Sequence, residues 1–411
     1  LLWRLADLVE ENLEFIAELE TRDNGKPAFE SARVDLPFVV SNFRYFAGWA
    51  DKLAGDVIPV SGSFLNYTLR EPLGVIGAII PWNFPLNIAS WKLAPALACG
   101  NAVILKPAEE TPLTALLLGE LALEAGFPPG IVNVIPGRGP VTGQAMVEHP
   151  GIDKIAFTGS TETGRIVMKT AAESLKKVSL ELGGKSPNVV FADADLKAAV
   201  RGAITGIFYG KGEVCAAGSR LFVEASIKDE FMEQLASKAA GMTVGDPNHP
   251  KTRLGAIVSK GQHERVLSYI EAGIAEGATL RTGGQAATVD GRGYFVEATV
   301  FDDVTPDMII AREEIFGPVL ATLTFDDLDD AVAQANQTIY GLAAGVWTRD
   351  VGKAHRFARA VRAGTEWVNT YNRYDPGSPF GGFKQSGFGR DLGERALEEY
   401  TQTKSVWVAL D

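Results

Sequence analysis

A loop of small residues surrounds one of only two cysteines in the chain. The segment FYGKGEVCAAGSR, residues 208–220, places Cys215 after two closely spaced glycines and before the run Ala-Ala-Gly. A structural cysteine usually packs among bulky apolar side chains, whereas a nucleophilic thiolate needs open space and a backbone that can approach the reacting atoms. The loop therefore favours a nucleophile, although a lone cysteine beside a turn is more often a packing residue.

Two other polar side chains would complete such a site. Glu181 lies in VSLELGGK between apolar residues and a Gly-Gly turn, where desolvation would raise its pKa towards that of a general base. Asn83 lies in PWNFPLN between two prolines, which would aim its amide rigidly, as an oxyanion donor must be aimed. A nucleophile, a base and an oxyanion donor together are the parts of an acyl-transfer site.

Seven motifs with these residues among them occur in order between Pro81 and Arg390: PWNFP, ILKPAEETP, FTGSTETG, LELGGK, GEVCAAGSR, EEIFGPV and SPFGGFKQSGFGR. In their order and spacing the chain resembles the NAD(P)-dependent aldehyde dehydrogenase superfamily, of the hydrolytic, acid-forming type. The resemblance implies that Cys215 attacks an aldehyde and that Asn83 holds the oxyanion. It also implies that hydride passes to NAD and that Glu181 activates the water that releases a carboxylic acid.

Composition limits the other classes of function. A chain of 411 residues exceeds the size at which one core stops growing, so two or more domains are expected. Its net charge of −12 argues against nucleic acid and anionic membranes as partners. Two cysteines cannot form a disulfide framework, and a thiol nucleophile needs a reducing compartment, which predicts a cytoplasmic protein. The chain opens inside an amphipathic helix, residues 1–26, so we expect further residues before it.

One uncharged stretch, residues 73–91, has the length of a membrane span. Pro81 and Pro85 interrupt it, and glycines and asparagines interrupt it further. We interpret it as a buried parallel strand, GVIGAII, that runs into a loop.

Strand and helix patterns alternate along the rest of the chain, which predicts an α/β protein with parallel sheets. Combined with the resemblance, this predicts a Rossmann-like cofactor domain, a second α/β catalytic domain and a small β oligomerisation arm. The NAD-binding domain would span 1–53 and 73–183, and the catalytic domain 184–384. Segments 54–72 and 397–411 would supply the arm strands, and their exposed edges predict self-association to a dimer or tetramer. The alternative is a hairpin that folds back on its own domain.

Candidate cofactor residues follow two strands of the first domain. Gly159, Ser160 and Gly164 lie where a strand meets a helix N-terminus, a place that suits a pyrophosphate, although Ser160 could simply cap the helix. Lys106 and Glu109 could bind ribose hydroxyls, and the carboxylate would repel a 2′-phosphate, which favours NAD over NADP. The resemblance assigns the nicotinamide side to Glu314, rather than Glu313, and to Phe316, and it adds contacts at Pro81, Trp82 and Leu182.

The sequence does not determine which aldehyde is the substrate. By position, six residues would line an aldehyde tunnel that is aromatic with polar tips: Asn87, Trp91, Tyr209, Asn372, Tyr374 and Phe380. A cationic aminoaldehyde could stack on such rings, and a small or aromatic aldehyde fits as well. The four histidines have no metal-ligand spacing, and the chemistry needs no metal.

Two alternatives stay open. A CoA-acylating semialdehyde dehydrogenase would pass the acyl group to CoA, but the presence of Glu181 favours hydrolysis. A truncated or non-catalytic protein of the same fold should have lost a catalytic part, and all three parts are here. Two positions depart from the usual pattern: Gly210 replaces a polar residue, and Glu213 would oppose thiolate formation if it pointed inward. We expect Glu213 to point away.

Overall fold

The first sheet has six strands that lie in the order β17-β7-β6-β3-β4-β5. The computed structural model describes all residues, 1–411. All neighbours in this sheet are parallel except β17, which pairs antiparallel with β7. The strands are short and mostly buried, as apolar runs between covering helices must be. Their bounds are β3 Val75–Ile79, β4 Ala102–Lys106, β5 Val132–Val134, β6 Lys154–Thr158, β7 Lys177–Glu181 and β17 Gly387–Phe388.

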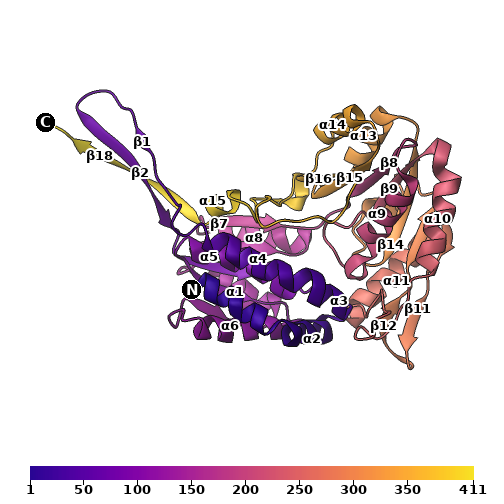
Figure 1. Cartoon of the computed structure of the whole chain (residues 1–411), viewed down its shortest axis with the longest axis horizontal. Helices are drawn as coiled ribbons and strands as arrows, with labels where there is room; N and C mark the ends of the chain where they lie inside the picture. Colours follow the sequence, from indigo (N-terminus) through magenta and orange to yellow (C-terminus); the bar gives the residue numbers. More distant parts are fainter.

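Helices connect and cover these strands (Figure 1). Within the sheet the connections are α5 Pro85–Ala98, α6 Leu113–Glu124, α7 Gln144–Glu148 and α8 Thr161–Ala172. The chain begins with α1 Leu2–Glu11, α2 Leu13–Asn24, α3 Ala28–Glu30 and, after a π-helical turn over Ser31–Asp35, α4 Leu36–Ala47.

The single helix predicted over residues 1–26 is wrong, because the helix breaks at Asn12. This residue has φ −104° and ψ 15°, and its side-chain Nδ2 donates to the Leu8 carbonyl at 2.9 Å. An asparagine side chain that bonds to the preceding turn competes with the helical ladder, so the chain restarts as a second helix.

The second sheet has seven strands in the order β10-β13-β14-β9-β8-β15-β16, again parallel except at one edge, where β10 is antiparallel. The strands are β8 Pro187–Val190, β9 Arg220–Glu224, β10 Thr279–Thr282, β13 Thr299–Asp302, β14 Val319–Phe325, β15 Ala343–Trp347 and β16 Thr365–Val368. Its helices are α9 Leu196–Phe208, α10 Lys228–Ala240, α11 Lys260–Ala275, α12 Ile309–Arg312, α13 Leu328–Asn336 and α14 Val351–Ala360. A separate hairpin joins β11 Ala286–Val289 to β12 Arg292–Val296. Two mainly parallel sheets with helices confirm the predicted α/β class.

A three-stranded antiparallel sheet projects from the first half of the molecule (Figure 1). It contains β1 Val57–Ile58, β2 Phe64–Pro72 and, after the short helix α15 Arg395–Glu399, β18 Thr401–Ala409. β18 pairs with β2 along its whole length, from Thr401 opposite Pro72 to Ala409 opposite Phe64. Residues 57–72 and the C-terminal segment of the chain thus build one arm.

The uncharged stretch 73–91 folds as β3, a loop and the first half of α5. No helix in the structure has both the length and the apolar character that crossing a membrane requires.

Candidate active site

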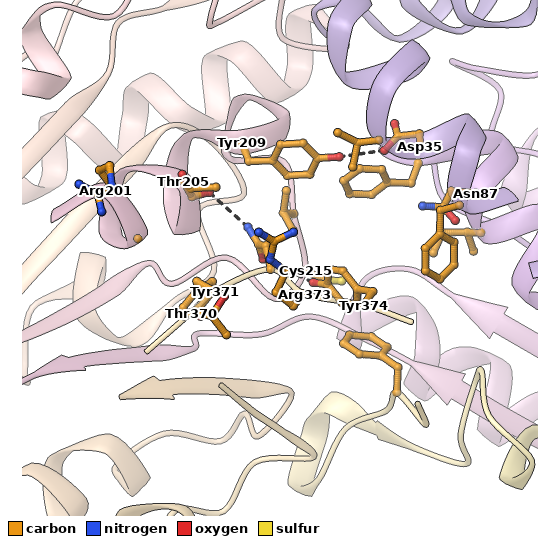
Figure 2. Close-up of a pocket in the computed structure, with 18 of the residues that line it drawn as sticks. Asp35, Asn87, Arg201, Thr205, Tyr209, Cys215, Thr370, Tyr371, Arg373 and Tyr374 are labelled. Atoms are coloured by element: carbon orange, nitrogen blue, oxygen red, sulfur yellow. Dashed lines mark hydrogen bonds between the residues drawn. The ribbon is translucent and has the colours of Figure 1, made fainter. Parts of the chain in front are cut away.

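A cavity of about 550 Å³ lies between the two halves, and Cys215 forms part of its wall (Figure 2). Its lining comes from α4 and α5 of the first half and from α9 and the segment after β16 of the second. The six predicted tunnel residues all line this cavity: Asn87, Trp91, Tyr209, Asn372, Tyr374 and Phe380. Residues from distant parts of the chain therefore surround the thiol.

The loop before the cysteine has an unusual backbone. Gly210, Lys211 and Gly212 have φ values of +57°, +62° and +73°, three consecutive residues in the left-handed region. Glycine adopts this conformation readily, but a lysine there is uncommon. At Gly212 a Cβ would lie 2.2 Å from the Gly317 carbonyl oxygen, so this position also requires glycine for space. The loop turns sharply from the end of α9 and presents Cys215 to the cavity.

The Cys215 thiol is in an environment that disfavours its charged form. Burial raises the pKa of this thiol to about 12, and the negative charges of Glu181 and Glu314 act in the same direction. The thiol is therefore protonated near neutral pH, and attack on a carbonyl requires that its proton be removed.

Asn83 is tied to the nucleophile loop. It lies between β3 and α5 with 7% of its surface exposed, and its Nδ2 donates to the backbone oxygen of Glu213 at 2.9 Å. An amide nitrogen carries two hydrogens, so one is left for a substrate oxygen. Asn24, the last residue of α2, donates from its own Nδ2 to the Trp82 carbonyl at 2.8 Å and so holds the Asn83 loop from behind.

The Glu213 side chain points away from the thiol, as expected. Its Oε2 forms an ion pair with Lys211 Nζ at 2.7 Å, and its Oε1 accepts a hydrogen bond from the Val258 amide at 3.2 Å. Lys211 Nζ also donates to the Asn24 carbonyl oxygen at 3.0 Å and to its Oδ1 at 2.9 Å. Burial raises the pKa of Glu213 and lowers the pKa of Lys211, and the ion pair opposes both shifts.

Glu181 ends β7 with 5% of its surface exposed, and neither of its carboxylate oxygens has a hydrogen-bond partner. Burial raises the pKa of this carboxyl well above its usual range, and the charge of nearby Asp391 adds to the effect. Lys92 and Asp391 form a buried ion pair at 2.5 Å beside it, and Lys92 opposes the shift. An unpartnered buried carboxyl with a raised pKa is suited to accept a proton from water.

The residues predicted for the ribose groups lie at two places. At the end of β4, Lys106 Nζ contacts the Glu109 carboxylate at 3.3 Å, and the same carboxylate accepts the Gly139 amide at 3.2 Å. In the second half of the molecule, Glu314 accepts the Gly184 amide at 2.9 Å, and burial raises the pKa of Glu314 to about 7.

The neighbouring Glu313 lies differently from Glu314. Its carboxylate accepts the Tyr269 hydroxyl at 2.7 Å, so it is already engaged on another side. There is no room for a side chain at position 183, because a Cβ at Gly183 would lie 2.2 Å from a Glu314 carboxylate oxygen. The Gly184 amide thus holds the Glu314 carboxylate in place.

The start of α8 is capped by Ser160, whose Oγ accepts the Thr163 amide at 3.2 Å. The two glycines beside it are needed for packing: a Cβ at Gly164 would lie 2.5 Å from Leu182, and one at Gly159 would lie 2.6 Å from the Phe157 ring. The Phe157 and Leu182 side chains therefore explain both glycines. The free amides at the start of α8 lie beside them.

Two aromatic rings approach each other from the two halves of the molecule. Trp82, which follows Pro81 in the loop after β3, meets the Phe316 ring edge to face with centroids 5.2 Å apart. Phe316 itself has φ +61°, a strained conformation for a non-glycine residue. Two of the residues predicted to bind the cofactor, Trp82 and Phe316, are thus brought together from distant parts of the sequence.

Several residues of the cavity wall were not predicted from the sequence, among them Asp35, Phe38, Arg201, Thr205 and Arg373. Arg201 and Thr205 are four residues apart on α9, the helix that leads to the cysteine loop, so helical spacing could have indicated that they share a face. For Asp35 and Arg373 the sequence carries no comparable signal.

The two mainly parallel α/β units, the shared cavity and the thiol in its wall are the features of an α/β dehydrogenase. The family model described as "Aldehyde dehydrogenase family" matches residues 1–406, and the chain belongs to this family of aldehyde-oxidising enzymes.

Relatives support the assignment. Human retinal dehydrogenase 2 is 51% identical over 411 residues, which cover 100% of this chain and 79% of the relative. Human mitochondrial aldehyde dehydrogenase is 52% identical over 409 residues, which cover 99% of this chain and 79% of the relative. The NAD⁺ complex of an aldehyde dehydrogenase from Bacillus cereus superimposes with a TM-score of 0.98 at 51% identity and covers 100% of this chain and 83% of that one.

Proposed function

We propose that this enzyme oxidises an aldehyde to a carboxylic acid through a covalent bond to Cys215, with NAD as the cofactor. The observation that carries the proposal is the arrangement around the thiol. Cys215 opens onto a cavity of about 550 Å³, the Asn83 amide is bonded to the same loop, and Glu181 is close enough to raise the pKa of the thiol.

Each residue has one role. The Cys215 sulfur bonds to the aldehyde carbon as the thiol proton passes to water. The Asn83 amide and the Cys215 backbone N–H stabilise the carbonyl oxygen as it becomes negative. Oxidation turns this adduct into a thioester. Glu181 then removes a proton from water, the water oxygen bonds to the acyl carbon, and the carbon–sulfur bond breaks to return the thiol and release the acid.

The chain has residues that fit NAD, which when bound would supply the hydride acceptor. Lys106 and Glu109 suit the hydroxyls of one ribose, and the free amides at the start of α8, beside Ser160, suit the pyrophosphate. Glu314, fixed by the Gly184 amide, suits the other ribose. The NAD⁺ complex of the similar Bacillus cereus enzyme supports this choice of cofactor.

Rapid-mixing NADH fluorescence tests the mechanism. Cys215→Ala should abolish aldehyde oxidation and retain NAD binding. Glu181→Gln should give a burst of about one equivalent of NADH per active site and then turn over on the order of 10²–10⁴-fold more slowly, because the thioester accumulates. A diminished burst would instead make Glu181 the base that activates Cys215. Undiminished steady-state turnover would remove Glu181 from the mechanism.

We also propose the domain roles. Residues 1–53 and 73–183 would bind NAD, residues 184–384 would carry the catalytic loop, and segments 54–72 and 397–411 would join copies of the chain. Exposed apolar side chains on the arm, Phe64, Leu69 and Trp407 among them, support self-association. Removal of residues 401–411 should lower the mass measured by light scattering, and an unchanged mass would refute the assignment of the arm.

A further inference from the structure

Two arginines in the cavity wall have no acidic partner. Arg201 projects from α9 and Arg373 from the segment after β16, and both line the same cavity as Cys215. No carboxylate oxygen lies within 4.0 Å of either guanidinium. This is notable in a chain with a net charge of −12, in which acidic side chains outnumber basic ones by 51 to 39. Unpaired cations in a binding cavity attract an anionic ligand.

The only carboxylate in the cavity wall is already compensated. Asp35 accepts hydrogen bonds from the buried Lys26 ammonium at 2.6 Å and from the Tyr209 hydroxyl at 2.8 Å. Both Asp35 oxygens therefore have a hydrogen-bond partner, although Lys26 is shared with the buried Glu20 carboxylate at 3.1 Å. The lining thus supplies two arginines without an acidic partner and one carboxylate whose oxygens are both engaged.

The arginines of the cavity come from α9 and from the segment after β16. Arg201 and Thr205 lie on α9, and Asn372 Nδ2 donates to the Thr205 carbonyl at 3.2 Å, which fixes the segment that carries Arg373 (Figure 2). In the same cavity wall Trp91 packs against Tyr374 and Phe380, with ring centroids 6.2 and 5.4 Å apart. A cavity of about 550 Å³ is large enough for an aldehyde with a substantial body, so the arginines and the aromatic rings can contact different parts of one substrate.

We propose that the preferred substrate is an aldehyde whose far end carries a carboxylate, and that Arg201 and Arg373 are the residues that select it. The proposal rests on the proposed oxidation at Cys215 and adds the class of substrate. A guanidinium binds a carboxylate through charge-assisted and often bidentate hydrogen bonds. A cationic aminoaldehyde, which the aromatic rings alone would accept, would meet two like charges here.

The test compares 6-oxohexanoate with hexanal, which has the same chain length without the charge, and measures NADH formation as kcat/KM. The wild-type enzyme should prefer 6-oxohexanoate, and each of Arg201→Gln and Arg373→Gln should reduce the ratio of the two kcat/KM values by about fivefold. The preference should also weaken as salt is raised, because exposed charges are screened within about 8 Å at 0.15 M.

Arg349→Gln is the matched control, since Arg349 is an exposed arginine of the same half of the molecule that does not line the cavity. This variant should keep the wild-type ratio. A preference for hexanal or for 4-(trimethylammonio)butanal, or a ratio that Arg349→Gln lowers as much as the cavity variants do, would overturn the proposal.

A binding measurement separates this proposal from the proposed chemistry. Trp91 and Trp347 line the cavity, so tryptophan fluorescence of the Cys215→Ala variant can report the binding of the product-like acids adipate and hexanoate without turnover. Adipate, with its second carboxylate, should bind more tightly than hexanoate. The substitutions Arg201→Gln and Arg373→Gln should each reduce this difference in affinity. Equal binding of the two acids would refute the arginine site even if Cys215 acts as proposed, and absence of NADH from every aldehyde would refute only the oxidation.

Discussion

Replacement of Lys211 by methionine should lower the free energy of unfolding by about 3–5 kcal/mol, because it breaks a buried ion pair and leaves one charge behind. Lys211 is 1% exposed and has three partners: Glu213 Oε2 at 2.7 Å, the Asn24 carbonyl oxygen at 3.0 Å and Asn24 Oδ1 at 2.9 Å. Methionine fills most of the same volume, so the loss of packing is small and the uncompensated Glu213 charge dominates.

A second substitution measures how much of this loss comes from the Glu213 charge. Glu213→Gln removes the charge, while the remaining side-chain oxygen can still accept the Val258 amide. The double variant Lys211→Met/Glu213→Gln should therefore recover roughly 2 kcal/mol relative to Lys211→Met alone, which lies within the usual range of coupling energies between contacting residues. The Asn24 carbonyl still lacks its partner in the double variant, so recovery should be incomplete.

The effect should depend on pH in a defined direction. Burial raises the pKa of Glu213 above its ordinary value of 4.5, and loss of Lys211 removes the positive charge that opposes this shift. A carboxyl whose pKa is higher in the folded than in the unfolded state binds its proton on folding, so it costs little below the unfolded pKa and progressively more as the pH rises towards the folded pKa. The deficit of Lys211→Met should be small near pH 4.5 and large near pH 7.5.

Urea unfolding followed by tryptophan fluorescence, at both pH values and for all variants, gives these differences. Lys260→Met is the matched control, because Lys260 forms an exposed pair with Glu264, with side chains 70% and 63% exposed at 3.6 Å, and its loss should cost less than about 1 kcal/mol. An equal loss in the Lys211 and Lys260 variants, or a double variant no more stable than Lys211→Met, would refute the reasoning. The Lys211→Met variant should also lose activity, because the Glu213 backbone oxygen positions Asn83. Its kcat should fall by a larger factor than its KM for NAD changes.

Three further predictions follow from single residues. Cys99 is 6% exposed and packs near the Leu397 carbonyl, so Cys99→Ala should cost about 1 kcal/mol of stability and leave kcat unchanged, and a loss of turnover at wild-type stability would contradict this. Glu109→Gln should narrow the preference for NAD over NADP by roughly fivefold in kcat/KM, whereas a wild-type preference for NADP would show that Glu109 has another role. Burial raises the pKa of Glu181 well above the usual range, so the rate of acyl-enzyme hydrolysis should increase as the pH rises beyond the ordinary glutamate range. Acid release in a single turnover measures this rate, and the Glu181→Gln variant should lose the pH dependence.

The sequence alone predicted the α/β class and the region of the site, because both depend on patterns of neighbouring residues. Short apolar runs alternate with helical periodicity, and turn residues separate them, so the parallel sheets could be expected. The small residues around Cys215, the apolar flanks of Glu181 and the prolines beside Asn83 each carry a local signal of their environment. Local patterns are less reliable at breaks, as the interruption of the first helix at Asn12 shows.

Tertiary structure decided the charges and partners at the site, because these depend on residues that are distant in sequence. The Glu213 side chain could have pointed towards the thiol, and it is the contact with Lys211 and the Val258 amide that turns it away. The raised pKa of Cys215 results from burial beside Glu181, which only the folded chain produces. That Arg201 and Arg373 have no carboxylate oxygen within 4.0 Å is likewise decided only once α9 and the segment after β16 meet. Residue type and periodicity are properties of a segment, whereas desolvation and electrostatic pairing are properties of the space that several segments enclose.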